Sequence, residues 1–287
     1  MMTVVDTHMH IWTTDWDRYP FSPPEAAHPQ AGTRRPDEPN TTEEVLDMTA
    51  QHGVDFTVLV QVRYYGWDNR YLADCLRRYP GKFAAQGLID PRDPAAADRL
   101  AFWMREHGLA GMRLSPSYDR HAEWLDSRDS EPLWRRAEEL SAILNFLIRE
   151  EQFPQLEAMA GRFPGVPVVV DHMGYPDITG DTANLLRLAR LPNAYVKVTE
   201  FYNHSKKKKY PYADVLPTVR RVYDAFGPRR LMWGTGFVHG ERVGRIPYGQ
   251  ELELIQEHVP FFTPADQEWI LGRTALTLWR FPAATGA

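Results

Sequence analysis

The chain has 287 residues, a formal net charge of −5 and one cysteine. This length can bury a full core, and no Gly-, Ser- or Pro-rich linker divides it, so we expect one domain spanning residues 1–287. The negative charge excludes an extended phosphate-binding surface, and nucleic acid is not an expected partner. A single cysteine excludes an intramolecular disulfide, and the helical pattern around Cys75 indicates packing.

The amino-terminal residues run directly into an apolar pattern, without the basic and apolar regions of a signal peptide. No segment approaches the roughly 18 uninterrupted apolar residues of a membrane span. We therefore expect a cytoplasmic protein that does not bind membranes, as a monomer or a homo-oligomer. The basic run at 206–209 is interpreted as the solvated tip of a loop, which leaves an anionic substrate open.

Eight short apolar runs alternate with helical segments. We expect strands near residues 4–10, 56–64, 83–90, 109–115, 142–149, 166–172, 195–200 and 230–235. Thr41 and Glu44 form a capping-box pattern, and Thr263 followed by Pro264 marks the start of the last helix. Eight repeats in about 250 residues predict an α/β fold, a (β/α)8 TIM barrel. An open doubly wound sheet is the alternative, but the early glycine-rich phosphate turn that it would usually show is missing.

Two stretches, 12–40 and 238–250, do not fit the repeat. Loops that follow the strands of a barrel all open onto its carboxyl-terminal face. We therefore expect both stretches to be insertions that cover an active site at that face, rather than peripheral packing.

The strongest chemical signal is the run DTHMH at 6–10, which carries His8 and His10. Alternate residues of a strand point the same way, so both imidazoles face one point. Neutral imidazole is a common ligand of zinc and iron, whereas a pair of satisfied histidines at the barrel mouth is an equally good interpretation of this pattern alone. His172, at the end of a later strand, adds a third ligand or a general acid/base, and Asp171 is expected to orient an imidazole or the local backbone.

These motifs resemble the amidohydrolase superfamily, in particular the amidohydrolase-related group of sugar and pyrone lactonases and several decarboxylases. The resemblance spans nearly the whole chain and is carried by DTHMHIW at 6–12, GMRL at 111–114, VDHMG at 170–174 and RRLMWGT at 229–235. It implies a barrel, metal ligands at His8, His10 and His172, and substrate contacts from Arg113.

The chain departs from this family pattern after the eighth strand, where Gly236 stands in place of an aspartate. In the family's hydrolases that carboxylate binds metal and relays the proton of the attacking water, and glycine can do neither. A replacement carboxylate is expected first from Glu200 and otherwise from Glu150 or Glu151. Exposed glutamates paired with lysines are the alternative interpretation.

Further candidates lie at strand ends and in the loops that follow them. Three arginines favour an anionic small-molecule substrate: Arg63, Arg113 and Arg149. Aromatic residues indicate a substrate with apolar or ring character: Trp12, Tyr64, Tyr65, Trp67, Phe201 and Tyr202. His204 and His239 are candidate acid/base residues or bystanders.

The leading hypothesis is a metal-dependent hydrolase of a small carboxylated lactone or cyclic ester or amide, using one or two zinc, manganese or iron ions. Histidines with one or two carboxylates also suit a non-heme iron or diiron monooxygenase on the same barrel. Decarboxylation, and a catalytically dead barrel that binds a ligand, are the remaining alternatives.

Overall fold

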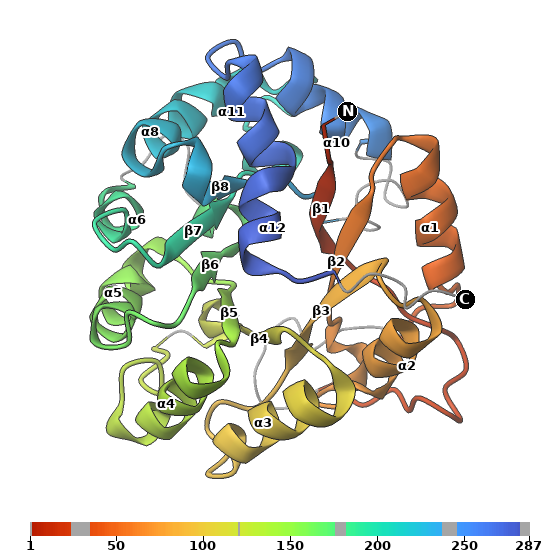
Figure 1. The fold of residues 1–287 in the computed structure, drawn as a ribbon. Coiled ribbons are helices and arrows are strands. Elements are labelled where there is room, and N and C mark those ends of the chain that lie inside the picture. Colours follow the sequence, from red (N-terminus) through yellow and green to blue (C-terminus); the bar gives the residue numbers. More distant parts are fainter. Residues whose placement is uncertain (1, 24–34, 120, 176–181, 237–245, 282–287) are drawn as a thin grey trace.

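The structure is a computed structural model that describes residues 2–23, 35–119, 121–175, 182–236 and 246–281. Eight parallel strands pair in sequence order: β1 (Val5–Met9), β2 (Phe56–Val60), β3 (Phe83–Leu88), β4 (Gly111–Leu114), β5 (Ile143–Phe146), β6 (Val168–Val170), β7 (Ala194–Lys197) and β8 (Leu231–Met232). The Thr7 amide donates to the Trp233 carbonyl at 3.2 Å, and the Gly236 amide donates to the His8 carbonyl at 2.8 Å. These bonds bring β8 back to β1, so the strands form the expected (β/α)8 barrel (Figure 1).

Helices surround the barrel: α1 (Thr42–Gln51), α2 (Arg70–Arg78), α3 (Ala96–His107), α4 (Glu131–Leu140), α5 (Phe153–Arg162), α6 (Ala183–Leu188), α7 (Phe201–His204), α8 (Leu216–Phe226), α10 (Tyr248–Glu257), α11 (Pro264–Glu268) and α12 (Thr274–Leu278). The capping boxes expected at Thr41 and Thr263 are both present. Within the described ranges, no helix has the length and apolar character that crossing a membrane requires.

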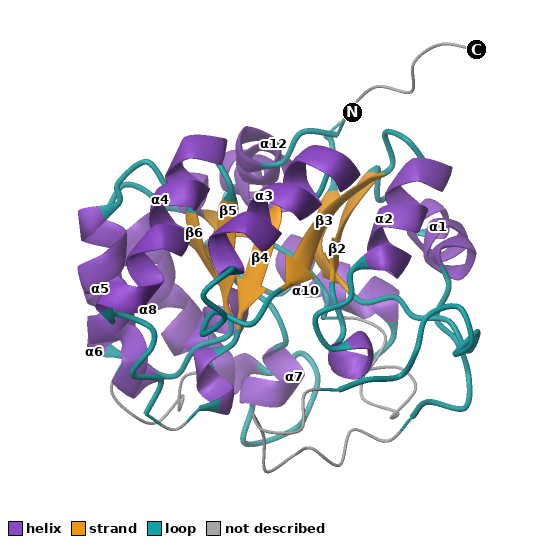
Figure 2. Ribbon diagram, turned by 90° about the horizontal axis from the view of Figure 1, so that it is seen from below, coloured by secondary structure: helices purple, strands orange, loops and turns teal. Residues whose placement is uncertain are grey.

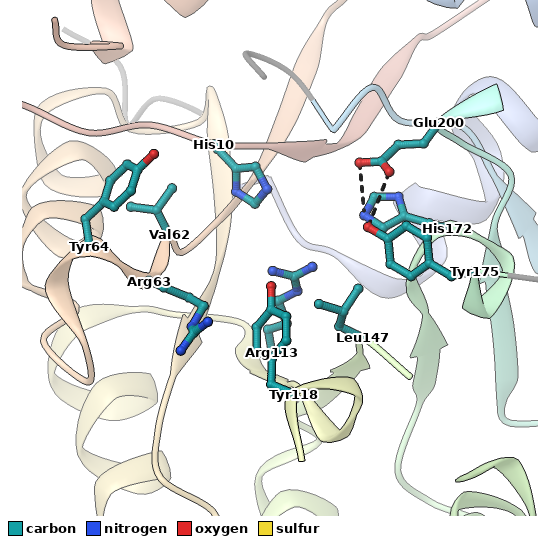
Figure 3. Close-up of a pocket in the computed structure, with 10 residues that line it drawn as sticks. All are labelled: His10, Val62, Arg63, Tyr64, Arg113, Tyr118, Leu147, His172, Tyr175 and Glu200. Atoms are coloured by element: carbon teal, nitrogen blue, oxygen red, sulfur yellow. Dashed lines mark hydrogen bonds and ion pairs between the residues drawn. The ribbon is translucent and has the colours of Figure 1, made fainter. Parts of the chain in front are cut away.

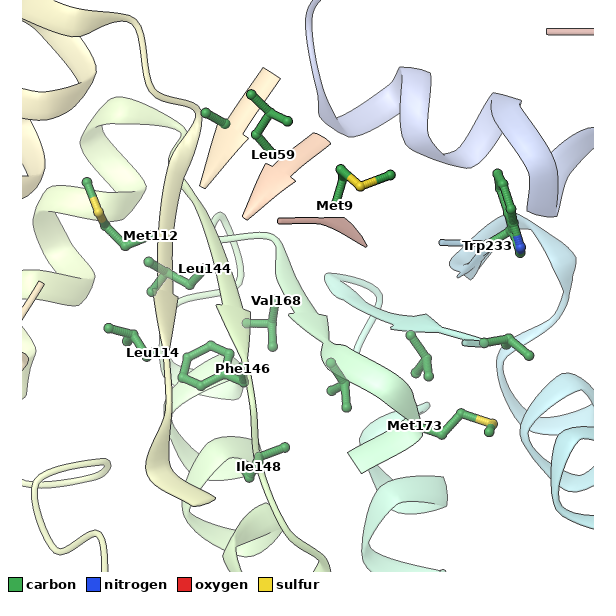
Figure 4. Packing of buried hydrophobic residues seen from close by; sticks show 14 of the residues in the cluster. Met9, Leu59, Met112, Leu114, Leu144, Phe146, Ile148, Val168, Met173 and Trp233 are labelled. Carbon is green, nitrogen blue, oxygen red and sulfur yellow. The ribbon is translucent and has the colours of Figure 1, made fainter. Parts of the chain in front are cut away.

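The barrel interior is apolar at the amino-terminal end of the strands. Inward-facing side chains from six strands form one cluster with α12 and the residue that follows it: Val5, Val58, Ala84, Ile143, Val169, Met232, Ala275 and Trp279. Figure 1 shows α12 lying across this end of the barrel. Their sequence neighbours, such as Leu59, Leu144 and Val168, point outward and pack against the helices (Figure 4).

The interior becomes polar toward the carboxyl ends of the strands. Asn145 lies two residues after Ile143, and Asp171 lies two residues after Val169, so both pairs share the inward face. Lys197 is the last residue of β7 and is fully buried. Because buried charges require partners, this layer predicts ion pairs inside the barrel.

The chain after β6 turns in an unusual way. Four successive residues have left-handed φ angles: His172 (53°), Met173 (53°), Gly174 (71°) and Tyr175 (47°). Each non-glycine residue in this conformation costs roughly 1–2 kcal/mol. The expected strand 166–172 therefore ends earlier, at Val170, and β8 likewise ends at Met232 rather than near residue 235.

Loops at the carboxyl ends of the strands lie together on one side of the barrel (Figure 2). In the described part of the first expected insertion, Trp12 pairs with Asn40, and the Ser22 amide donates to the Tyr64 carbonyl at 2.8 Å. Residues 24–34 of this stretch, and 238–245 of the second one, lie outside the described residues.

Candidate active site

A pocket of about 270 Å³ opens at the carboxyl ends of the strands. Residues from six strand ends or the loops after them line it (Figure 3): His10, Val62, Arg63, Tyr64, Arg113, Tyr118, Leu147, His172, Tyr175 and Glu200. Active sites of (β/α)8 enzymes are built at this face. Six of these residues were expected from the sequence, and the fold brings them together although they span nearly 200 positions of the chain.

His10 lines the pocket, and His8 lies beside it in the barrel interior. His8 is fully buried, and its Nε2 atom is 3.3 Å from Nε2 of His10. The Nδ1 atom of His10 is 2.8 Å from the carbonyl oxygen of Val60. A carbonyl oxygen can only accept, so Nδ1 of His10 carries the proton and its Nε2 presents a lone pair.

A buried ion-pair cluster lies behind His8. The ammonium of Lys197 is 3.0 Å from Oδ1 of Asp171 and 3.2 Å from Nδ1 of His8. Arg113 donates through Nε to Oδ2 of Asp171 at 2.8 Å. Burial would raise the pKa of Asp171, but Lys197, His8 and Arg113 together hold this pKa well below its usual range. The Asp171 carboxylate is therefore ionised, and each of its oxygens faces a cation.

The motifs imply a divalent metal, and the side chains around His8 determine whether such an ion can bind. In the described part of the chain, one group here has its ligand atoms all within 4.8 Å of one another: His8, Asp171 and His172. Both oxygens of Asp171 are already ion-paired, and Lys197 places a positive charge 3.2 Å from His8. A divalent ion would be repelled by both cations, while Asp171 is already neutralised by them and Glu200, 3.5 Å from His172, has a raised pKa, so these carboxylates compensate only in part. The residues present therefore do not fit a bound divalent metal.

His172 and Glu200 form another wall of the pocket. Nδ1 of His172 is 2.7 Å from the Thr199 hydroxyl, and its Nε2 is 3.5 Å from Oε1 of Glu200 (Figure 3). Oε2 of Glu200 accepts from the Asn203 side chain at 2.5 Å and from the Tyr175 hydroxyl at 3.3 Å. Burial raises the pKa of Glu200, although these hydrogen bonds partly oppose the shift. A carboxylate of raised pKa is suited to accept a proton near neutral pH.

Gly236 lies directly against this carboxylate. A Cβ atom at residue 236 would collide with Oε1 of Glu200 and approach its Cγ to 3.1 Å. The φ angle of Gly236 is +68°, which also favours glycine. The residue that departs from the family pattern thus leaves room for a carboxylate supplied from the end of β7.

Arg63 supplies positive charge at the pocket wall. Its guanidinium lies over the ring of Tyr118, with its central carbon 4.3 Å from the ring centroid. Burial lowers the pKa of Arg63, and the described residues around it provide no carboxylate partner. Because Arg113 is already paired with Asp171, Arg63 is the better placed arginine to bind a carboxylate of a ligand.

Three charged candidates from the sequence are not brought to the pocket lining. The carboxylate of Glu150 accepts from the amide of Asn184 at 2.7 Å, next to the start of α6. Arg149 donates to the carbonyl of Ser117 at 3.3 Å, and Glu151 is exposed. The chain after β5 enters a short 3-10 helix, which directs these side chains toward neighbouring loops and helices.

The remaining candidates lie around the pocket or outside the described residues. Trp12 packs edge-on against Tyr64, with ring centroids 5.4 Å apart, and so supports the pocket wall from behind. Tyr202 lies under the ammonium of Lys208, 4.6 Å away. His204 contacts the ring of Tyr175 at 5.8 Å, and burial lowers the pKa of His204 to about 4. His239 lies outside the described residues.

Sequence reasoning missed Lys197, Tyr118 and Tyr175. Lys197 had a usable signal, because a lysine at an inward position of an apolar strand must be paired. Tyr175 had none, since its position depends on the left-handed turn after β6. Tyr118 follows Pro116 in a short 3-10 helix after β4, which no local pattern predicted.

A closed eight-stranded barrel with histidines, arginines and a glutamate around one pocket at the carboxyl ends of its strands is the architecture of a (β/α)8-barrel enzyme. The chain belongs to the amidohydrolase family, whose model matches residues 5–281. The L-fucono-1,5-lactonase of Burkholderia ambifaria is 26% identical to it, over 98% of this chain and 97% of the relative.

Solved structures share the whole fold. A putative 2-pyrone-4,6-dicarboxylic acid hydrolase from Pseudomonas putida superposes with a TM-score of 0.79 at 25% identity, covering 98% of both chains. An amidohydrolase from Burkholderia multivorans, crystallised with bound zinc, has a TM-score of 0.75 at 21% identity and covers 96% of this chain and 98% of its own. These names give no support to the monooxygenase alternative.

Proposed function

We propose that this protein hydrolyses a small lactone that carries a carboxylate, with Glu200 as the base that activates water. The observation that carries the proposal is the position of the Glu200 carboxylate, which faces the pocket in the space left by Gly236. The named activities of the relatives, a sugar lactonase and a pyrone dicarboxylic acid hydrolase, support a cyclic ester as substrate.

The pocket offers one residue for each task of the reaction. Arg63 binds the substrate carboxylate, and Arg113, held in place by Asp171, stabilises negative charge on the carbonyl oxygen. Glu200 takes a proton from water as the water oxygen adds to the carbonyl carbon. The ring C–O bond then breaks, and the alkoxide leaving group takes that proton from Glu200. The product is an open-chain hydroxy acid.

No step of this reaction uses a metal ion. The positive charge that a metal would supply at the carbonyl oxygen comes from Arg113, and Arg63 binds the substrate carboxylate. The zinc, manganese or iron expected from the motifs is therefore absent from the proposed chemistry, because the side chains do not fit it.

A panel of lactones tests the proposal. The purified protein should open five- and six-membered lactones that bear a carboxylate, with a higher kcat/KM than for neutral lactones of the same ring size. Release of one acid equivalent per turnover, followed by pH-stat titration, measures the reaction. If no carboxylated lactone is opened at any pH at which the protein stays folded, the proposal fails.

A further inference from the structure

We propose that Lys197 is a positioning residue that fixes which nitrogen of His8 carries the proton, and thereby prevents His8 and His10 from acting as metal ligands. This role is independent of lactone turnover. It concerns a residue that does not line the pocket and that acts through two histidines.

Val60, His10, His8 and Lys197 form a row of hydrogen-bonding groups. The Val60 carbonyl at one end is an acceptor, and the Lys197 ammonium at the other end is a donor. At the pocket end, the Val60 carbonyl requires the proton of His10 to sit on Nδ1, which leaves a lone pair on its Nε2. At the buried end, the Lys197 ammonium has only protons to offer. His8 lies between them, with Nδ1 toward Lys197 at 3.2 Å and Nε2 toward His10 at 3.3 Å.

One arrangement of protons satisfies this row. His8 accepts from Lys197 at Nδ1, carries its own proton on Nε2, and donates this proton to the lone pair of His10. In the opposite tautomer, the Nδ1–H of His8 would turn from Lys197 at 3.2 Å to the longer contact with Oδ1 of Asp171 at 3.4 Å, and two lone pairs would face each other at 3.3 Å. Lys197 and His8 are both completely buried, so bulk solvent does not relieve either conflict.

The ammonium itself is held in place by Asp171. Its Oδ1 atom is 3.0 Å from the Lys197 nitrogen and 3.4 Å from Nδ1 of His8. Without the lysine, Asp171 would be the nearest partner of that imidazole nitrogen, and His8 would carry its proton on Nδ1. Its Nε2 would then present a lone pair beside that of His10, which is the arrangement of a metal-ligating histidine oriented by a carboxylate.

Lys197 therefore selects between two states of the same histidine pair. With the ammonium present, Nε2 of His8 is protonated and cannot bind a metal. With a neutral side chain at residue 197, two lone pairs 3.3 Å apart become available, which is close to the spacing of two nitrogens about 2.0–2.1 Å from a tetrahedral zinc.

The wild-type protein allows a direct test by nitrogen-15 NMR of the histidine rings. His8→Gln and His10→Gln identify the two residues by the loss of their signals. We expect the proton of His8 on Nε2 and that of His10 on Nδ1, in protein treated with chelator. A proton on Nδ1 of His8 would overturn the proposal, whether or not the protein opens lactones.

A second test uses Lys197→Met, which keeps the length of the side chain and removes its charge. In this variant the proton of His8 should move to Nδ1, and zinc affinity measured by calorimetry should rise by about tenfold or more. Lys82→Met, at an exposed position after α2, is the matched control and should bind zinc like the wild type. Unchanged zinc affinity in folded Lys197→Met would contradict the proposal, and the wild-type NMR result decides the case if that variant does not fold.

Discussion

The carboxylate of Glu200 lies where a side chain at Gly236 would project. The two residues follow β7 and β8, which are neighbours in the barrel, so a carboxylate from either strand end can reach the same place beside His172. Glu200 has a left-handed backbone, with φ at 56°, which turns its side chain toward the pocket. Strained residues of this kind are found at functional sites more often than elsewhere.

Glu200→Gln should retain the fold and lose most of the activity. The amide has nearly the same shape but cannot accept the proton of water, so kcat should fall by about 10²- to 10⁴-fold. Steady-state kinetics on a carboxylated lactone measures this effect, with a thermal melt to confirm folding. Wild-type kcat in this variant would remove Glu200 from the mechanism.

Gly236→Asp should inactivate the enzyme while Glu200 is present, because the two side chains compete for one space. The double variant Glu200→Gly with Gly236→Asp removes the collision and supplies a carboxylate from β8. We expect it to be more active than either single variant. Equal inactivity of all three would show that a carboxylate at this place is not sufficient.

Arg63→Met should weaken the binding of anionic substrates. Loss of a charged hydrogen-bonding partner should raise KM for a carboxylated lactone by roughly tenfold or more, with a much smaller change for a neutral lactone. Arg149→Met is the matched control, since Arg149 bonds to Ser117 away from the pocket lining. An equal rise of KM for both substrates would indicate a structural role instead.

Activity should fall in acid as Glu200 becomes protonated. The base must be ionised to accept a proton, and burial raises its pKa above the ordinary value of 4.5. The acid limb of kcat/KM should therefore lie above pH 4.5, and it should rise with pH until Glu200 is ionised. A profile that is flat down to pH 4.5 would exclude this assignment.

Asp6 should make folding stability depend on pH in the opposite sense to an ordinary paired carboxylate. Burial raises the pKa of Asp6 from 3.8 to about 6, although hydrogen bonds from His8 and Thr235 oppose the shift. The folded state thus holds this proton more tightly, and the stabilisation present below pH 3.8 is lost as pH rises through 6. Relative to Asp6→Asn, the wild type should lose on the order of 3 kcal/mol of unfolding free energy across this range. Denaturant unfolding at both ends of the range measures it.

The positions of the strands and of most pocket residues could be predicted from the sequence. Parallel strands buried on both faces leave continuous apolar runs, and residues at their carboxyl ends must meet at one face. For this reason His10, Arg113 and Glu200 were expected together and lie together.

The partners inside the barrel could not be predicted, because they depend on register between distant strands. Lys197 reaches His8 across 189 positions of the chain, and no local pattern encodes that contact. Glu150 was expected near the histidines, but its carboxylate binds the amide of Asn184 instead. Whether the histidine motif binds a metal depends on these same contacts, because Lys197 and Arg113 neutralise the carboxylate of Asp171.

The backbone conformation of Tyr175 lowers the stability of the fold, while its hydroxyl group donates a hydrogen bond to Glu200. Its φ angle of 47° costs energy in every folded molecule, and Tyr175 remains 39% exposed. Laboratory selection for a higher Tm alone would therefore favour glycine or asparagine at residue 175. Either substitution would remove the hydroxyl that donates to Glu200. Selection for stability at this position would therefore release the carboxylate that we propose as the base.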